Sequence, residues 1–86
     1  GFSLGNALLA DGEFQAAVDE LRRAVGFDPA YSAAWKLLGK ACLDAGQPQA
    51  AAEAWQSGIA AAARRGDKQA EKEMTVFLRR LEKISP

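Results

Sequence analysis

The sequence predicts an all-α fold, a row of antiparallel helical hairpins with about five helices in 86 residues. Three observations support this prediction: a repeat with a period of 34 residues, a composition that is 49% hydrophobic but only 8% aromatic, and the absence of alternating strand-like runs. A period of about 20–50 residues is typical of stacked supersecondary units. Alanine supplies much of the apolar content, and it favours helices that pack closely.

The internal repeat appears when the sequence is shifted by 34 residues. Residues 2–26 then align with residues 36–60, with eight identities in 25 positions. The longest match sets LGNALL at 4–9 against LGKACL at 38–43. Each copy is long enough for two helices and a turn, so the repeat predicts two similar hairpins side by side.

The first hairpin is predicted from residues 2–10 and 13–26. Asp11 and Gly12 end its first helix, because a glycine just past a helix end accepts the left-handed conformation that caps it. Pro29 closes its second helix, since the residue before a proline resists helical geometry. Apolar residues in the second helix recur at helical spacing, namely Phe14, Ala17, Val18, Leu21, Ala24 and Val25.

The second hairpin is predicted from residues 30–45 and 48–65. Gly46 ends its first helix, and Pro48 stands where a first helical turn tolerates proline. Gly66 stops its second helix, which is longer than its counterpart in the first copy. One face of the first helix is apolar and comprises Trp35, Leu38, Ala41, Cys42 and Ala45.

A fifth helix is predicted over about residues 67–84. Asp67 is a good N-cap for it. The helix is not a third copy, because the 34-residue shift places Lys72 and Glu73 where a Leu-Gly pair would stand. Its apolar stripe consists of Ala70, Met74, Phe77, Leu78 and Leu81, with charged residues elsewhere.

Charge and cysteine content narrow the function classes. The chain has 11 basic and 11 acidic residues, with a net charge of −3 over residues 1–63 and +3 over residues 64–86. Neither part has the basic density of a nucleic-acid-binding surface, so no nucleic-acid partner is expected. Without a run of 18 apolar residues, no membrane partner is expected either. A lone Cys42 excludes an internal disulfide and favours a reducing compartment, the cytoplasm.

The two copies resemble the tetratricopeptide repeat, a helix–turn–helix of about 34 residues. The second copy contains Trp35-x2-Leu38-Gly39-x2-Cys42 and Ala51-x3-Trp55, and the first contains Leu4-Gly5-x2-Leu8, Ala17-x3-Leu21, Ala24 and Pro29. The departures from the family pattern are Cys42 and Leu8 for the usual aromatic residue, Gly58 for alanine and Ala63 for the closing proline. The resemblance covers about residues 1–60.

This resemblance implies a right-handed α–α superhelix that forms one domain over residues 1–86. Repeat one would span about 1–31, repeat two about 32–65, and a capping helix about 67–84. Small residues at Gly5, Gly39, Ala17 and Ala51 would let the two helices of a hairpin approach closely. The large side chains are then expected to fill holes between neighbouring hairpins, namely Trp35, Leu38, Leu21 and Trp55.

The family also implies a binding site, because the first helix of each pair lines an inner groove that receives a partner segment. The groove positions that match are Phe2, Asn6, Leu9, Lys36, Lys40 and Leu43, with Ala10, Ala33 and Asp44 beside them. Lys36 and Lys40 are four apart and share one helix face. They suggest an acidic peptide or a C-terminal carboxylate as the ligand. The alternative is that the two lysines simply keep a solvated face soluble.

The carboxylate clamp of chaperone-binding relatives is absent from this sequence. Asn6 matches one clamp asparagine, but Phe2 stands where the clamp needs a lysine and Leu37 where it needs a second asparagine. No chaperone tail is therefore expected as the partner.

Enzymatic chemistry is not expected. The chain has no histidine, which removes the commonest general base and metal ligand. Cys42 falls on a core-facing position, where a packed apolar role is favoured over a nucleophilic one. The basic residues of the fifth helix are interleaved with acidic ones, which favours a solvated face over a phosphate-binding strip. No cofactor, metal or catalytic residue is predicted.

These observations favour a non-enzymatic protein–protein interaction module that binds a partner segment in the concave groove. The alternative is a structural role, as the C-terminal end of a longer repeat array or as a self-associating unit. Phe2 and Leu4 would lie on an exposed apolar end in that case. An accessory subunit of an enzyme is a weaker third hypothesis that the sequence does not separate from the first.

Overall fold

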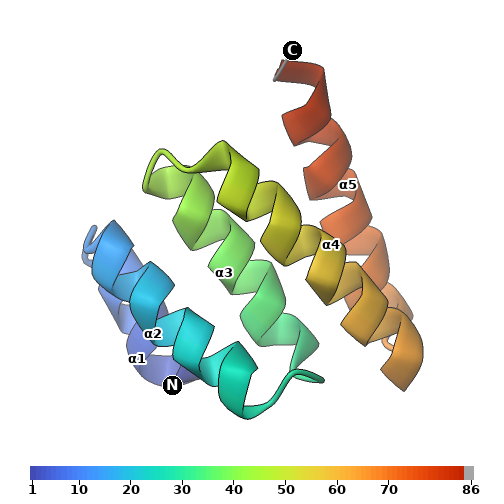
Figure 1. Ribbon diagram of the computed structural model, residues 1–86, viewed down its shortest axis with the longest axis horizontal. Coiled ribbons are helices and arrows are strands. Elements are labelled where there is room, and N and C mark those ends of the chain that lie inside the picture. Colours follow the sequence, from blue (N-terminus) through green and yellow to red (C-terminus); the bar gives the residue numbers. More distant parts are fainter. Residues whose placement is uncertain (85–86) are drawn as a thin grey trace.

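The computed structural model describes residues 1–84, and in that part of the chain all regular structure is helical. Consecutive helices run antiparallel (Figure 1). This arrangement confirms the predicted all-α fold of stacked helical hairpins. In space, α3 contacts both α1 and α5, and α4 packs on both α3 and α5. The five helices are α1 (Phe2–Ala10), α2 (Phe14–Phe27), α3 (Ser32–Asp44), α4 (Pro48–Arg65) and α5 (Lys68–Ile84).

Three glycines make the turns that follow α1, α3 and α4. Gly12, Gly46 and Gly66 have φ values of 78°, 76° and 74°, which lie in the left-handed region that favours glycine. They end the helices that the sequence analysis expected them to end. Observed helix boundaries differ from the expected ones by two residues at most, with α2 extending to Phe27 and α3 starting at Ser32.

Close contact within each hairpin depends on a glycine that faces a large side chain. A Cβ atom at Gly5 of α1 would lie 2.6 Å from the side chain of Leu21 in α2. The same atom at Gly39 of α3 would lie 2.0 Å from the indole Nε1 of Trp55 in α4. Leu21 and Trp55 therefore fill space inside their own hairpins, and Trp55 also packs on Phe77 of α5.

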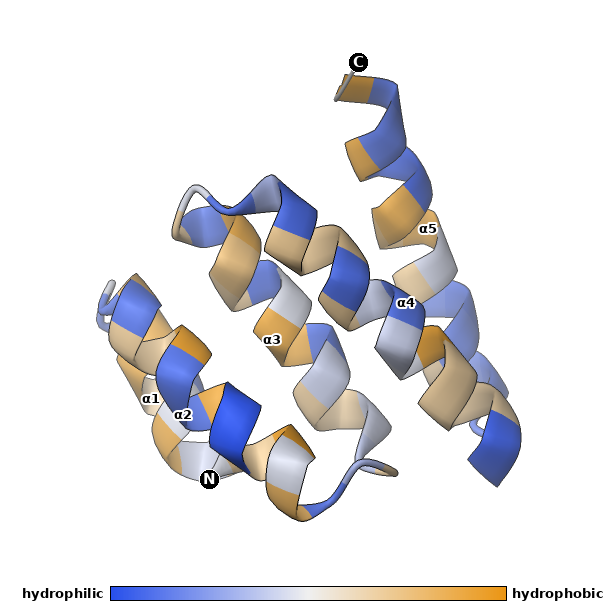
Figure 2. Ribbon diagram, viewed as in Figure 1, coloured by the Kyte–Doolittle hydropathy of each residue, from blue (hydrophilic) through white to orange (hydrophobic). Residues whose placement is uncertain are grey.

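The apolar face of α5 packs against the second hairpin. Ala70, Met74 and Leu81 are buried, while polar and apolar residues alternate along the helix (Figure 2). The Met74 thioether lies beside Gly58 of α4, where a Cβ atom would approach its sulfur to 2.4 Å. Asp67 caps the helix, because its carboxylate accepts a hydrogen bond from the Ala70 backbone N–H at 3.1 Å.

Candidate partner-binding groove

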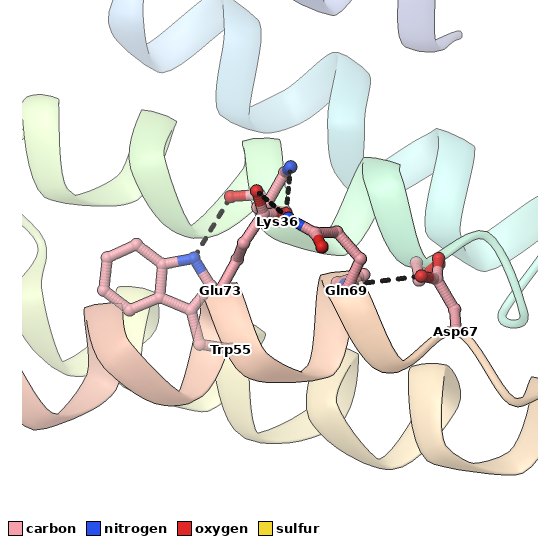
Figure 3. A network of polar contacts seen from close by, with 7 residues as sticks. Lys36, Trp55, Asp67, Gln69 and Glu73 are labelled. Carbon is pink, nitrogen blue, oxygen red and sulfur yellow. Dashed lines mark hydrogen bonds and ion pairs between the residues drawn. The ribbon is translucent and has the colours of Figure 1, made fainter.

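A polar network fixes α5 along α3 (Figure 3). The Lys36 ammonium donates to Glu73 Oε1 at 2.8 Å, and the Ser32 hydroxyl donates to Asp67 Oδ2 at 2.8 Å. The Gln69 amide donates to Glu73 Oε2 at 3.3 Å. Ser32 and Lys36 lie one helical turn apart, so a single face of α3 holds the first two turns of α5.

The carboxylates of this network are stabilised in their charged form. The Ala70 backbone N–H and then the Ser32 hydroxyl lower the pKa of Asp67 from its ordinary value. Hydrogen bonds from Lys36 and then Gln69 lower the pKa of Glu73. Both pKa values fall because hydrogen bonds to a carboxylate favour ionisation.

Acidification is expected to destabilise the fold through these two groups. A carboxylate whose folded pKa is depressed contributes stability above its unfolded pKa, about 3.9 for Asp and 4.3 for Glu, and loses that contribution as pH falls through the folded value. The free energy of unfolding should therefore be constant near neutral pH and decrease below about pH 4.5. Urea denaturation between pH 7 and pH 3, followed by circular dichroism, measures this dependence.

The variants Asp67→Asn and Glu73→Gln should weaken the pH dependence and lower stability at neutral pH. Glu82→Gln on the same helix is the matched control, because Glu82 forms no ion pair within residues 1–84. An unchanged pH profile in the Asp67 and Glu73 variants would show that the network does not contribute to the acid sensitivity.

The groove consists of two adjoining hollows between α3 and α5. Lys40 of α3 and Phe77 of α5 line both of them, so the hollows are neighbours that share part of their walls. The first hollow has a volume of about 270 Å³ and is lined by Phe2, Asn6, Ala33, Lys36, Leu37, Lys40 and Phe77. The second has a volume of about 250 Å³ and is lined by Lys40, Leu43, Asp44, Trp55, Phe77 and Arg80.

The structure places most of the expected groove residues together. Four of the six line the first hollow, namely Phe2, Asn6, Lys36 and Lys40, and Leu43 lines the second. Leu9 lines neither hollow and is half-buried against the core. Of the flanking positions, Ala33 and Asp44 line the hollows, whereas Ala10 is exposed outside them.

Helix α5 also lines the groove, which its sequence pattern did not lead us to expect. Phe77 was expected only in the apolar stripe that packs on the hairpin, yet it is half-buried and forms part of both hollows. Its ring centroid lies 5.5 Å from that of Trp55. Arg80, three residues later, lines the second hollow. The available signal was the width of the apolar stripe, since Val76, Phe77 and Leu78 are consecutive and cannot all face one hairpin.

The two lysines that were expected to give the groove its charge differ in their surroundings. Both line the first hollow, but Lys36 also forms an ion pair with Glu73 of α5, a partner that the sequence did not indicate. Lys40 has a side chain that is 62% exposed, and its only ion pair within residues 1–84 is with Asp44 at 3.6 Å, one turn along the same helix. Exposed pairs of this kind contribute little to stability.

Two larger hollows are also present among the described residues. One, of about 440 Å³, lies between α2 and α4 and is lined by residues that include Trp35, Cys42, Arg22 and Glu53. The other, of about 540 Å³, lies at the amino-terminal end beside Phe27 and shares Phe2 with the first hollow of the groove. In the hollow between α2 and α4 the opposite charges balance, whereas Lys40 and Arg80 face a single carboxylate in the second hollow of the groove.

Metal binding and thiol chemistry have little support in residues 1–84. They contain no cluster of three or more His, Cys, Asp or Glu side chains that could hold a metal ion. Cys42 is buried, and burial raises the pKa of its thiol, which disfavours the reactive thiolate. None of the described helices is both long and apolar enough to span a bilayer.

Stacked antiparallel hairpins with an inner groove define a helical repeat protein. The sequence profile described as tetratricopeptide repeat matches residues 8–71, and the chain belongs to the tetratricopeptide repeat family. Repeats of this family generally mediate protein–protein interactions, and the family is a non-enzymatic one.

Two similar proteins agree with this assignment. A TPR repeat-containing protein of Pseudomonas aeruginosa is 55% identical over 82 residues, which are 95% of this chain and 78% of that protein. A protein of Bordetella parapertussis with a known solution structure is 50% identical and superposes with a TM-score of 0.86, covering 95% of this chain and 71% of that one.

Proposed function

We propose that this chain is a non-enzymatic interaction module that binds a segment of a partner protein in the groove between α3 and α5. The observation that supports this most is that two neighbouring hollows share Lys40 and Phe77 in their walls. Each hollow is smaller than the roughly 300–1,000 Å³ of small-molecule sites. Two small adjoining hollows suit successive side chains of a peptide better than one compact ligand.

Polar groups in the groove fit a peptide of acidic character. The Asn6 side chain makes no hydrogen bond within residues 1–84, and its amide can both donate to and accept from a peptide backbone. Lys40 and Arg80 bring two positive charges to the second hollow, against one negative charge from Asp44. Apolar contact would supply most of the affinity, and the positive charges would set the polarity preference.

Leu43→Ser is expected to weaken peptide binding by about tenfold, because one leucine side chain in contact with a ligand contributes about 1–2 kcal/mol. The probe is a set of 12-residue peptides selected from a random library on the wild-type protein. Fluorescence polarisation then gives the Kd of each selected peptide for the wild type and the variant. Leu43 is 39% exposed, so the variant should remain folded.

Ile84→Ser is the matched control, since Ile84 is 76% exposed and lines neither hollow. The control should bind the selected peptides as the wild type does. Equal Kd values for Leu43→Ser and the wild type, across all selected peptides, would show that the groove is not the binding site.

A second candidate function is structural, as the end of a longer array or as a self-associating unit. It is favoured by two large apolar side chains that are exposed on the first hairpin, since Leu4 is 53% exposed and Phe27 is 94% exposed. Exposed apolar side chains of this kind fit contact with a further helical repeat or with a second copy of the chain. Sedimentation velocity over a concentration series separates self-association from a monomeric interaction module.

In this proposal α1 with α2 forms the first repeat, α3 with α4 forms the second, and α5 is the cap of a single domain over residues 1–86. The buried free thiol of Cys42 suits a reducing compartment. The proposed site of action is accordingly the cytoplasm.

A further inference from the structure

We infer that the groove selects a partner segment in which a carboxylate side chain lies between two apolar side chains, and that Lys40 and Arg80 bind this carboxylate. The inference rests on the proposed function and specifies its ligand.

Lys36 is already paired in the folded protein. Its ammonium lies 2.8 Å from Glu73 Oε1, and the other oxygen of Glu73 accepts a hydrogen bond from Gln69. An acidic partner would have to displace Glu73, which belongs to the helix that Asp67 caps. Lys36 therefore holds α5 against α3, and its role is not to recognise the partner.

Lys40 and Arg80 are available. The ammonium of Lys40 lies 3.6 Å from Asp44 in an exposed pair, which a ligand carboxylate can replace at small cost. Arg80 is exposed and forms no ion pair within residues 1–84. Both line the second hollow, on α3 and α5 respectively, so a carboxylate there meets cations from two walls. Charge complementarity therefore favours an acidic partner.

The position of Lys40 sets the order of side chains in the ligand. Lys40 and Phe77 line both hollows, whereas Arg80 and Asp44 line only the second, so a carboxylate bound by Lys40 and Arg80 lies in the second hollow. Leu43 lines the same hollow. Beyond Lys40, the first hollow offers the apolar side chains of Phe2, Ala33 and Leu37. A segment that contacts Leu43 and also reaches the first hollow continues past the carboxylate in both directions, so the carboxylate belongs to a side chain and not to a chain terminus.

Two random libraries of 12-residue peptides test this inference, one in which the peptides have blocked carboxyl termini and one in which these termini are free. Each is selected against the wild type, against the double variant Lys40→Glu with Arg80→Glu, and against Arg64→Glu. Arg64 is the matched control, because it is an exposed cation at the end of α4 that lines neither hollow. Thermal melts followed by circular dichroism check that all variants are folded.

The wild type and Arg64→Glu should enrich blocked peptides with an Asp or Glu flanked by apolar residues. The double variant should lose this preference and bind those peptides at least about tenfold more weakly. Three outcomes would overturn the inference: no acidic preference, the same preference in the double variant, or enrichment only of peptides with free carboxyl termini. If peptides of any composition bind and depend on Leu43, the proposed function stands while the inference fails. If none depends on Leu43, the proposed function itself fails.

Discussion

Gly39→Ala is expected to lower the free energy of unfolding by about 2–3 kcal/mol, the combined effect of overpacking and of a strained hydrogen bond. The added methyl group would lie 2.0 Å from Nε1 of Trp55, a distance that forces the indole to move. That indole is buried and donates a hydrogen bond to the Lys36 carbonyl at 3.1 Å, so displacement weakens this bond as well. Urea denaturation followed by tryptophan fluorescence measures the change.

Gly26→Ala is the matched control for this experiment. Gly26 also lies in a helix, α2, but a Cβ atom there would meet no atom within 4 Å. The alanine should be neutral or stabilise the protein by up to about 1 kcal/mol, because alanine has the higher helix propensity. If the two variants unfold at the same urea concentration, the close approach at Gly39 is not a constraint on stability.

Trp55→Ala is expected to destabilise the protein by about 3–5 kcal/mol, the range found when large buried aromatic side chains are truncated. Trp55 is only 4% exposed and joins three helices: it belongs to α4, lies over Gly39 of α3 and packs against Phe77 of α5. A loss of this size is comparable to the whole stability of a small domain, about 5 kcal/mol. The variant should therefore be largely unfolded by circular dichroism at 37 °C.

Phe27→Ala provides the comparison for the Trp55 variant. Phe27 is 94% exposed, so its truncation removes little buried area and should change stability by no more than about 0.5 kcal/mol. A folded Trp55→Ala protein with an unfolding midpoint like that of Phe27→Ala would contradict the role of Trp55 as the central packing residue of the second hairpin and α5.

The fold was predictable from sequence because its determinants are local or periodic. The glycines that follow α1, α3 and α4 mark turns by their own backbone preference, and the repeat of 34 residues gives the stacking order. The packing partners of individual side chains were harder to predict. Periodicity identifies which side chains are buried, but it does not show whether Leu21 packs within its own hairpin or against the next one.

The residues that line the candidate groove were predicted in part, because repeat position is also a periodic property. Residues of α1 and α3 were placed in the groove by their repeat position, and the structure brings five of the six to its two hollows. The contributions of Phe77 and Arg80 depend on how α5 docks, which involves contacts between residues about 37 positions apart, such as Lys36 with Glu73. A non-local ion pair leaves no periodic signal in the sequence, so the pairing of Lys36 with Glu73 could not be predicted.

The attachment of α5 has a consequence for how binding would respond to conditions. Lys36 and Ser32 hold the start of the last helix through Glu73 and Asp67, and the same helix presents Phe77 and Arg80 to the groove. A change that detaches the first turns of α5 also removes one wall of the groove. A ligand that binds to this wall therefore stabilises the docked position of α5. Affinity and the local stability of the last helix would then depend on one equilibrium, and acid would lower both.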